Sequence, residues 1–173
     1  MTHAPHPHPV AVVTGAARGI GLASAQWFLQ RGYRVALLDN DAAALKATAS
    51  TLAERTDVLC LPCDVSQPPQ VAEAVNRIVS AFGRVDALVN NAGVAVFKPI
   101  GQTTFEEWRH VMGTNLDGVF LCTQLFAPVM QASGGGAVVN IASISGLRAS
   151  TLRVAYGTSK AAVVHLTKQQ AVE

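Results

Sequence analysis

Short apolar runs rich in valine alternate with helix-length amphipathic segments from Val10 onward. This alternation is typical of β-α units repeated around a parallel sheet. The runs are nearly continuous in apolar residues, which indicates a sheet that helices cover on both faces. The predicted strands are VAVVT at 10–14, RVALLD at 34–39, DVLCLP at 57–62, VDALVN at 85–90 and AVVNIAS at 137–143. We therefore predict an α/β fold with a doubly wound parallel sheet flanked by helices.

Capping residues predict where the helices between these strands begin and end. Glycine just past a helical pattern is a frequent C-terminal cap, and Asp, Thr or Pro often opens a helix. Thr104 and Glu107 have the spacing of a capping box. The other signals are Gly32, Gly83, Asp41, Pro68 and Pro69. Three glycines at 134–136 precede a strand instead of opening a helix, so they predict a tight turn and not a phosphate loop.

The composition narrows the classes of partner. Charged residues make up 14% of the 173 residues, against roughly 25% in an average soluble domain, so we expect much of the chain to be buried, part of it between subunits. The net charge is only +2 and the basic residues are scattered, which argues against a nucleic acid or an anionic membrane as partner. The uncharged segment 118–147 is interrupted by glutamine, proline, asparagine and three glycines, unlike a membrane span.

The N-terminal sequence MTHAPHPHP lacks the basic start and long apolar run of a secretory signal, so we expect a cytoplasmic protein. Residues 1–9 are predicted to be a disordered tail, although their three histidines could bind a stray metal ion. Cys60 and Cys63 form a lone C-x-x-C. Without a second pair of ligands this spacing favours ordinary cysteines near a strand end, and we predict no metal site.

The first predicted strand runs directly into TGAARGIG and then into a helical pattern. Gly15, Gly19 and Gly21, with Ile20 between the last two, therefore lie where a strand turns sharply into a helix N-terminus. Gly15 would allow the turn, Gly19 would let the backbone approach a pyrophosphate, and Gly21 would permit close packing of helix on strand. The helix dipole favours the phosphates. The sequence thus predicts a dinucleotide-binding Rossmann domain over residues 10–173.

The second predicted strand ends at Asp39, about 20 residues past the glycines, where its carboxylate can accept hydrogen bonds from the adenosine ribose hydroxyls. The same charge would repel a 2'-phosphate, so Asp39 favours NAD over NADP. Arg18 argues in the other direction, because a guanidinium beside the phosphate loop could pair with that 2'-phosphate. We give Asp39 more weight because its charge would lie nearest the hydroxyl in question, and we predict NAD as the cofactor.

Several motifs in a fixed order resemble the short-chain dehydrogenase/reductase family of the most common type, along nearly all of the chain after Pro9. The motifs are TGAARGIG, CDV at 63–65, NNAG at 90–93, TNLDGVF at 114–120, Ser143 before Tyr156, and YGTSK ending at Lys160. Each motif is weak by itself, but the ordered set is specific. Sugar epimerases and enoyl reductases share the fold, but the glycine spacing, NNAG and the Tyr-Lys step resemble the common dehydrogenases instead.

The resemblance implies roles for individual residues. Asp64 and Val65 would contact the adenine. The floor of the cofactor cleft would be shaped by Asn90, Asn91, Ala92 and Gly93. The catalytic tetrad would be Asn115, Ser143, Tyr156 and Lys160. Asn115 would hold a water in a proton relay to Lys160, and Lys160 would also bind nicotinamide-ribose hydroxyls beside Tyr156. Ser145 is the nearest rival to Ser143, although its spacing to Tyr156 fits the family less well.

Alcohol oxidation requires groups of the same chemical types as the residues of this tetrad. No side chain accepts a hydride, so a cofactor must carry it, and a proton must be exchanged at the substrate oxygen. A tyrosine normally titrates near pH 10, and a nearby ammonium favours its phenolate form. Tyr156 and Lys160 are four residues apart and would share a helix face. Ser143, at the end of the fifth strand, could hydrogen-bond the substrate oxygen. We predict an oxidoreductase that interconverts a small secondary alcohol and a carbonyl, with Tyr156 as acid/base.

Members of the resembled family usually continue beyond the Tyr-Lys helix, through further strands and a substrate-covering lid. QQAVE lacks a glycine cap. We therefore expect a truncated chain in which the C-terminal strands are missing, the fifth strand is an unprotected edge, and Val163, Val164 and Leu166 are less covered. The alternative hypothesis is an inactive fragment that binds nucleotide or self-associates. The resemblance also suggests a homodimer or homotetramer built through the TNLDGVF and Tyr-Lys helices.

Overall fold

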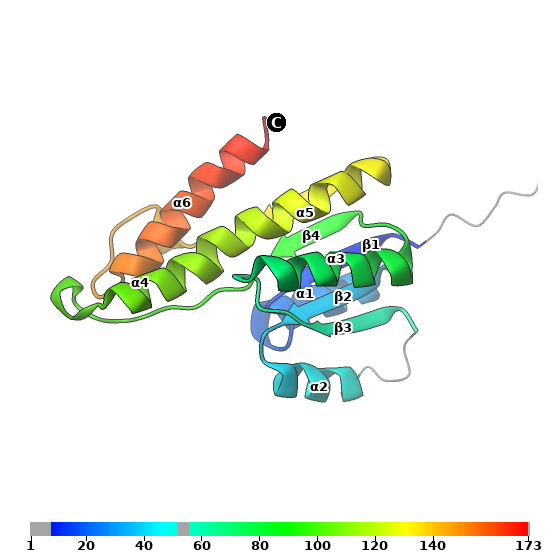
Figure 1. Cartoon of the computed structure of the whole chain (residues 1–173), viewed down its shortest axis with the longest axis horizontal. Helices are drawn as coiled ribbons and strands as arrows, with labels where there is room; N and C mark the ends of the chain where they lie inside the picture. Colours follow the sequence, from blue (N-terminus) through cyan, green and yellow to red (C-terminus); the bar gives the residue numbers. More distant parts are fainter. Residues whose placement is uncertain (1–7, 52–55, 173) are drawn as a thin grey trace, which may run out of the picture.

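The fold is a five-stranded parallel sheet with helices on both faces, given by a computed structural model that describes residues 8–51 and 56–172 (Figure 1). The strands are β1 (Val10–Thr14), β2 (Arg34–Asp39), β3 (Val58–Pro62), β4 (Ala87–Asn90) and β5 (Ala137–Asn140). The α-helices are α1 (Gly19–Leu29), α2 (Ala42–Thr51), α3 (Pro68–Phe82), α4 (Phe105–Met112), α5 (Gly118–Ala132) and α6 (Val154–Gln170). Short 3₁₀ turns cover Ile100–Gln102 and Ile144–Gly146, and a π-helical turn covers Gly113–Asp117. The doubly wound α/β prediction is confirmed.

The strand order is β3-β2-β1-β4-β5, so the chain reverses direction across the sheet between β1 and β4. In such open sheets, ligands bind outside the carboxyl ends of the strands at the point of reversal. The ends of β1 and β4 are adjacent because Val13 of β1 pairs with Val89 of β4. The topology therefore places a binding site beside Thr14 and Asn90, where the glycine motif and NNAG begin.

Alternate residues of the central strands face two separate apolar cores, as the two-residue period of a strand requires. Val10 and Val12 pack with Ile78 of α3 and Phe126 of α5 on one face. Val13 packs with residues of α1 and α2 on the other face. All five residues of β1 are buried. The prediction that helices cover both faces is therefore confirmed for the centre of the sheet.

At β5 the same prediction is wrong, because only one face of this strand is covered within the part of the chain that the structure describes. Val138 packs against the core that contains α3 and α5. The next residue, Val139, points to the opposite face and is 49% exposed. Helices α1 and α2 lie on this same face, but they pack against β1, β2 and β3 and not against β5. The expectation that the fifth strand forms an edge of the sheet is met.

The capping predictions hold. Asp41 accepts the N–H of Ala44 at 2.9 Å at the start of α2, and Thr104 and Glu107 form the reciprocal capping box of α4. Gly32 and Gly83 follow α1 and α3 with the positive φ expected of a C-terminal cap. Pro68 opens α3. The glycines at 134–136 form the turn before β5. No helix within 8–51 or 56–172 has both the length and the apolar character needed to cross a membrane.

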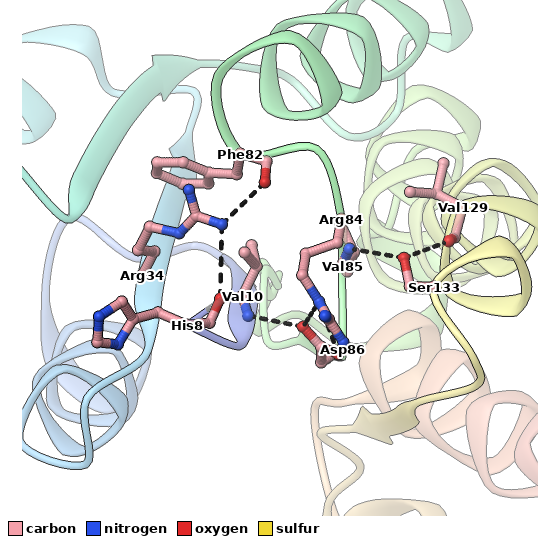
Figure 2. Close-up of polar contacts among 9 residues, drawn as sticks. All are labelled: His8, Val10, Arg34, Phe82, Arg84, Val85, Asp86, Val129 and Ser133. Atoms are coloured by element: carbon pink, nitrogen blue, oxygen red, sulfur yellow. Dashed lines mark hydrogen bonds and ion pairs between the residues drawn. The ribbon is translucent and has the colours of Figure 1, made fainter. Parts of the chain in front are cut away.

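The predicted tail of residues 1–9 lies mostly outside the described residues. At its end, the ring of His8 contacts the carbonyl oxygen of Gly32 through Nδ1, at 3.2 Å. The backbone oxygen of His8 accepts from Arg34, whose guanidinium also donates to the carbonyl of Phe82 at 2.8 Å and lies over its ring (Figure 2). These contacts tie the start of β1 to the ends of α1 and α3.

The fourth strand begins at Ala87, later than predicted, although the N–H of Asp86 still donates to the carbonyl of Val10 at 2.8 Å. The carboxylate of Asp86 accepts the N–H of Val10 at 2.8 Å and pairs with Arg84 (Figure 2). The N–H of Val85 donates to the hydroxyl of Ser133 at 3.4 Å. The fifth strand also ends earlier than predicted, at Asn140, because the chain then turns into the 3₁₀ segment that Ser143 caps.

Replacing Asp86 by asparagine will lower the free energy of unfolding at neutral pH by about 1–3 kcal/mol, because charged hydrogen bonds to Val10 and Arg84 are weakened. Burial opposes ionisation of Asp86, but the hydrogen bonds from Arg84 and Val10 outweigh it, so the pKa of Asp86 lies below its ordinary value. A depressed pKa stabilises the fold above the unfolded value near 3.9 and loses that contribution as the pH falls through the folded value.

Urea denaturation at pH 7 and at pH 3 checks this prediction. The difference between the wild type and D86N should be present at pH 7 and should shrink toward zero at pH 3. The control is Asp117→Asn, which changes an exposed carboxylate and should alter the unfolding free energy by less than about 0.5 kcal/mol. A D86N effect that is the same at both pH values would contradict the assigned role of the charge.

Candidate active site

The glycine motif forms the turn from β1 into α1, as predicted. Gly15 and Gly19 adopt left-handed backbone conformations, with φ of 62° and 57°, which glycine adopts without strain. A Cβ atom on Gly15 would lie 2.8 Å from the Cα of Ala92, and one on Gly21 would lie 2.2 Å from the carbonyl oxygen of Gly15. A Cβ on Gly19 would meet nothing within 4 Å. Gly15 and Gly21 are therefore packed closely, whereas Gly19 borders open space at the start of α1.

The phosphate loop is held to the end of β4 by two polar side chains. Asn91 donates through Nδ2 to the carbonyl oxygens of Thr14 and Gly15, at 2.9 and 3.0 Å. The hydroxyl of Thr14 accepts the N–H groups of Asn91 and Ala92, both at 3.0 Å. These bonds hold the loop after β1 to the loop after β4, at the point where the strand order reverses. The sequence analysis did not single out Thr14, although its position directly before the glycines was a usable signal.

Asp39 lies at the carboxyl end of β2 and is only 8% exposed. Its Oδ2 accepts the N–H of Ala17 in the phosphate loop at 2.9 Å, and its Oδ1 accepts the N–H of Asp41 at 3.0 Å. A carboxylate oxygen can accept more than one hydrogen bond, so both oxygens keep capacity for a ligand hydroxyl. The backbone thus positions the carboxylate beside the phosphate loop.

Arg18 pairs with Asp41, at 2.6 Å, and its side chain is 71% exposed. The backbone N–H of Ala44 contributes most to a lowered pKa of the Asp41 carboxyl, and the positive charge of Arg18 lowers that pKa further. The charge that could have paired with a 2'-phosphate is therefore already paired with a carboxylate. Nothing in the sequence pattern predicts this ion pair.

A cavity of about 410 Å³ opens between the phosphate loop and the loops after β2, β3 and β4. The predicted cofactor residues that line it are Gly15, Arg18, Ile20, Asp39, Asp64, Val65, Asn91, Ala92 and Gly93. The lining residues that the sequence analysis did not assign are Asn40, Cys63, Val94 and Thr114. All four directly adjoin predicted residues in the sequence, which was the available signal: Asn40 follows Asp39, Cys63 precedes Asp64, Val94 follows Gly93 and Thr114 precedes Asn115.

The carboxylate of Asp64 accepts the backbone N–H and the hydroxyl of Ser66, at 2.9 and 2.8 Å. Cys60 belongs to β3, and Cys63 is buried just beyond the end of this strand. Burial raises the pKa of Cys63 to about 11, so its thiol is protonated at neutral pH. Among the described residues, no group of three or more His, Cys, Asp or Glu side chains is arranged to hold a metal ion.

Helix α6 carries the predicted catalytic pair, Tyr156 and Lys160. Lys160 is only 4% exposed, and its ammonium donates to the carbonyl oxygen of Ile141 at 2.6 Å. The same ammonium lies 5.9 Å from the centroid of the Tyr156 ring. Burial lowers the pKa of Lys160. The helical spacing therefore does place the two side chains on one face, and a carbonyl just past β5 fixes the ammonium.

Asn115 lies in the π-helical turn between α4 and α5 and is fully buried. Its amide accepts the N–H of Val94 at 2.8 Å and donates to the carbonyl of Val94 at 2.9 Å and to the hydroxyl of Ser159 at 3.0 Å. A Cβ atom on Gly93 would lie 3.4 Å from the Asn115 oxygen and 3.6 Å from the Lys160 nitrogen. Gly93 therefore keeps a side chain out of the space near both groups.

The two candidate serines differ in accessibility. Ser143 is half-buried, and its hydroxyl oxygen accepts the N–H of Ser145 at 3.2 Å, which caps the following 3₁₀ turn. Ser145 is buried, with its hydroxyl 3.5 Å from that of Ser150. The accessible serine at the end of β5 is therefore Ser143, and it also has the structural role of a cap.

Residues 9–173 match the model of the family described as short chain dehydrogenase. The protein belongs to this family. Its curated relatives include 2-(R)-hydroxypropyl-CoM dehydrogenase of Xanthobacter autotrophicus, 44% identical over 169 residues, a match that covers 95% of this chain and 68% of the relative. D-threitol dehydrogenase of Mycolicibacterium smegmatis is 39% identical, with 95% and 64% covered. This short-chain dehydrogenase thus spans about two thirds of the length of these relatives.

Solved structures of short-chain dehydrogenases share the fold. An enzyme of the family from Burkholderia phymatum, in complex with NAD, has a TM-score of 0.91 and 36% identity. The match covers 94% of this chain and 59% of that one. NAD+-bound xylitol dehydrogenase has a TM-score of 0.90 and 33% identity, with 95% and 64% covered. The sequence resemblance to the family is therefore confirmed.

Proposed function

We propose that this short-chain dehydrogenase is an NAD(H)-dependent oxidoreductase that interconverts a small secondary alcohol and a ketone. The observation that carries the proposal is the buried ammonium of Lys160, held 5.9 Å from the Tyr156 ring and close to Gly93, a residue of the 410 Å³ cavity. A cation kept out of water stabilises a nearby phenolate more strongly than an exposed one would.

The residues around the cavity fit a dinucleotide. The N-terminus of α1 and the open space at Gly19 suit a pyrophosphate, and Asp39 offers acceptor oxygens for ribose hydroxyls. Asp64 and Val65 border the same cavity on the side of β3, where the adenine would lie. When bound, NAD+ would accept the hydride from the carbinol carbon.

The proton chemistry belongs to this chain. In the direction of oxidation, the substrate O–H bond would break and its proton would pass to the phenolate oxygen of Tyr156, as the carbinol C–H bond gives up its hydrogen with both electrons. In reduction, Tyr156 returns the proton to the oxygen. Lys160 stabilises the phenolate, and Ser143 would donate a hydrogen bond to the substrate oxygen. Asn115 would position the loop beside Lys160 through its bonds to Val94.

The activities for which the relatives are named support a small hydroxylated substrate. These relatives include an NAD-dependent glycerol dehydrogenase of Listeria innocua and a meso-2,3-butanediol dehydrogenase of Serratia marcescens. We extend this substrate class, a small molecule with a secondary hydroxyl, to the present protein.

We also propose a homo-oligomer built through α4, α5 and α6, because Phe105 and Phe120 are exposed on the first two of these helices. Light scattering after size-exclusion chromatography tests it, and a monomer would contradict it.

A fluorescence titration with NADH and NADPH, followed by a screen of secondary alcohols at saturating NAD+, tests the proposed function. We expect saturable binding with NADH preferred, and formation of NADH with at least one alcohol. Binding of NADH without turnover of any alcohol would instead support the alternative of an inactive nucleotide-binding fragment. Failure to bind either dinucleotide would overturn the assignment of the cavity.

Asparagine at position 39 will reduce the preference for NADH over NADPH by about tenfold or more, because the 2'-phosphate will no longer face a carboxylate. Asp41→Asn will reduce it less, by freeing Arg18 from its ion pair. The measured quantity is the ratio of the two dissociation constants from fluorescence titrations. The matched control is Asp117→Asn, and an unchanged ratio in D39N would show that another group sets the cofactor preference.

A further inference from the structure

A second cavity, of about 490 Å³, is lined by residues from the loops after β4 and β5, and one of them, Arg153, has its guanidinium carbon 5.9 Å from the centroid of the Tyr156 ring. Three large apolar side chains, Phe97, Ile144 and Leu152, form much of its wall, and all three are largely exposed. The polar part of the wall includes the hydroxyl residues Ser150 and Thr151 and a single cation, Arg153. None of these residues lines the 410 Å³ cavity, so this second cavity is available to a substrate.

Arg153 lies between two aromatic rings of this region. Its guanidinium carbon is 4.9 Å from the ring centroid of Phe97 and 5.9 Å from that of Tyr156. Within residues 8–51 and 56–172, no carboxylate forms an ion pair with this guanidinium. By contrast, the nearby cation Lys98 pairs with Glu107. Arg153 thus brings an uncompensated positive charge to an apolar cavity beside the candidate acid/base.

The backbone fixes Arg153 at this place. Lys98 and Arg153 form an isolated parallel bridge, and the N–H of Lys98 donates to the carbonyl of Leu152 at 3.1 Å. Leu152 has a φ of 60°, a left-handed conformation that is rare for a bulky residue and is found preferentially at ligand-binding and active sites. The bridge to the loop after β4 therefore holds a strained turn whose next residue is Arg153.

We propose that the substrate of the reaction is a short secondary alcohol or ketone that carries an anionic group, a carboxylate or a sulfonate, which Arg153 binds. This inference rests on the proposed function and specifies its substrate class. The guanidinium fork matches a planar or tetrahedral anion through two parallel N–H donors. Phe97, Ile144 and Leu152 would cover the short apolar arm between the anion and the carbinol carbon. A neutral polyol would leave Arg153 without a partner and its own hydroxyls against apolar walls.

The spacing of the groups limits the length of the arm. Because Arg153 lies 5.9 Å from the Tyr156 ring, an anion on the guanidinium and a hydroxyl on the phenol oxygen must be only a few bonds apart. During oxidation the anionic group is unchanged. The hydroxyl proton would pass to Tyr156 and bound NAD+ would take the hydride, so charge and electrons balance as in the general reaction.

Steady-state kinetics with matched pairs of substrates test the proposal at saturating NAD+. One pair is 3-hydroxybutanoate and 3-hydroxybutanamide, and the other is 2-hydroxypropane-1-sulfonate and its sulfonamide. The two members of each pair have the same carbon chain and hydroxyl, but one carries a negative charge and the other is neutral. We expect kcat/KM of the acid to exceed that of the amide by about 100-fold in at least one pair, because a site built for a charged partner rejects its neutral analogue strongly. Comparison of the two pairs tells carboxylate from sulfonate.

Arg153→Met should reduce that ratio of acid to amide by about 100-fold, and Arg153→Lys should keep part of it, because the charge remains without the planar fork. The control is Arg148→Met, which removes an exposed arginine from the neighbouring turn and should leave the ratio within about twofold. Circular dichroism and NADH titration report whether each variant is folded.

Equal kcat/KM for acid and amide in the wild type would overturn this inference and leave the proposed oxidoreductase intact. The same holds if R153M keeps the preference for the acid. Absence of turnover with acids, amides and the wider alcohol screen would overturn the proposed function and the substrate class together, so the two failures are distinguishable.

Discussion

Phenylalanine at position 156 will lower the rate of alcohol oxidation by about 10²–10⁴-fold, which is the usual contribution of a positioned acid/base. The ring and its place on α6 remain, but the oxygen that would exchange the proton is lost. The charge of Lys160, 5.9 Å from the ring, then has no phenolate to stabilise. The measurement is kcat, followed through NADH absorbance at saturating NAD+ with the best alcohol from the screen.

The matched control for this prediction is Tyr33→Phe, which removes a hydroxyl from a tyrosine that packs edge-on against Phe28, away from the site. Y33F should retain the wild-type rate within about twofold. Both variants should keep the wild-type circular dichroism spectrum. If Y156F turned over the alcohol at the wild-type rate, another group would have to exchange the proton, and Tyr156 would not be the acid/base.

Alanine at position 21 will abolish saturable NADH binding and lower the free energy of unfolding by about 1–3 kcal/mol, the usual cost of overpacking. Its Cβ atom would lie 2.2 Å from the carbonyl oxygen of Gly15 and 2.6 Å from the Nδ2 atom of Asn91. Neither group can move away independently, because Asn91 donates to that same carbonyl. The phosphate loop must therefore shift as a whole. NADH fluorescence titration and urea denaturation measure the two effects.

Gly101→Ala is the control for position 21. A Cβ atom on Gly101 would meet nothing within 4 Å, so this variant should bind NADH with the wild-type dissociation constant within about twofold. This control shows whether an added methyl group weakens NADH binding even when it lies outside the phosphate loop. Wild-type affinity in G21A would mean that the loop tolerates a displacement that its close contacts do not allow.

The features that depend on neighbours in sequence were predictable. The capping box at Thr104 and the glycine caps at Gly32 and Gly83 involve residues within one helical turn, and they form as predicted. The apolar runs predicted all five strands for the same reason. The hydrogen bond between the Asp86 carboxylate and Val10 was not predictable, because the two residues lie 76 positions apart in the sequence. No local pattern carries such a pairing.

In the candidate site, too, the residues with a local sequence signal were predicted and those that depend on distant contacts were not. The glycine motif and Asp39 marked one side of the cavity, because strand ends and tight turns leave a local signature. Thr114 was not assigned although it opens the TNLDGVF motif, because a motif does not show that this side chain lines the cavity from the π-helical turn between α4 and α5. The ion pair of Arg18 with Asp41 was missed because a side chain's partner depends on its orientation, which a motif does not contain.

Asn115 also bears on how the protein can be redesigned. Through Val94 and Ser159 this one amide joins the loop after β4 to the helix of Tyr156, and Ser159 in turn donates to the carbonyl of Tyr156 at 2.7 Å. The position of each of these segments is therefore coupled to that of the others through hydrogen bonds. Mutagenesis aimed at new substrates should leave this brace intact and concentrate on residues 147–151, whose side chains are exposed, and should spare Gly146, where a Cβ atom would lie 2.6 Å from the backbone of Lys160.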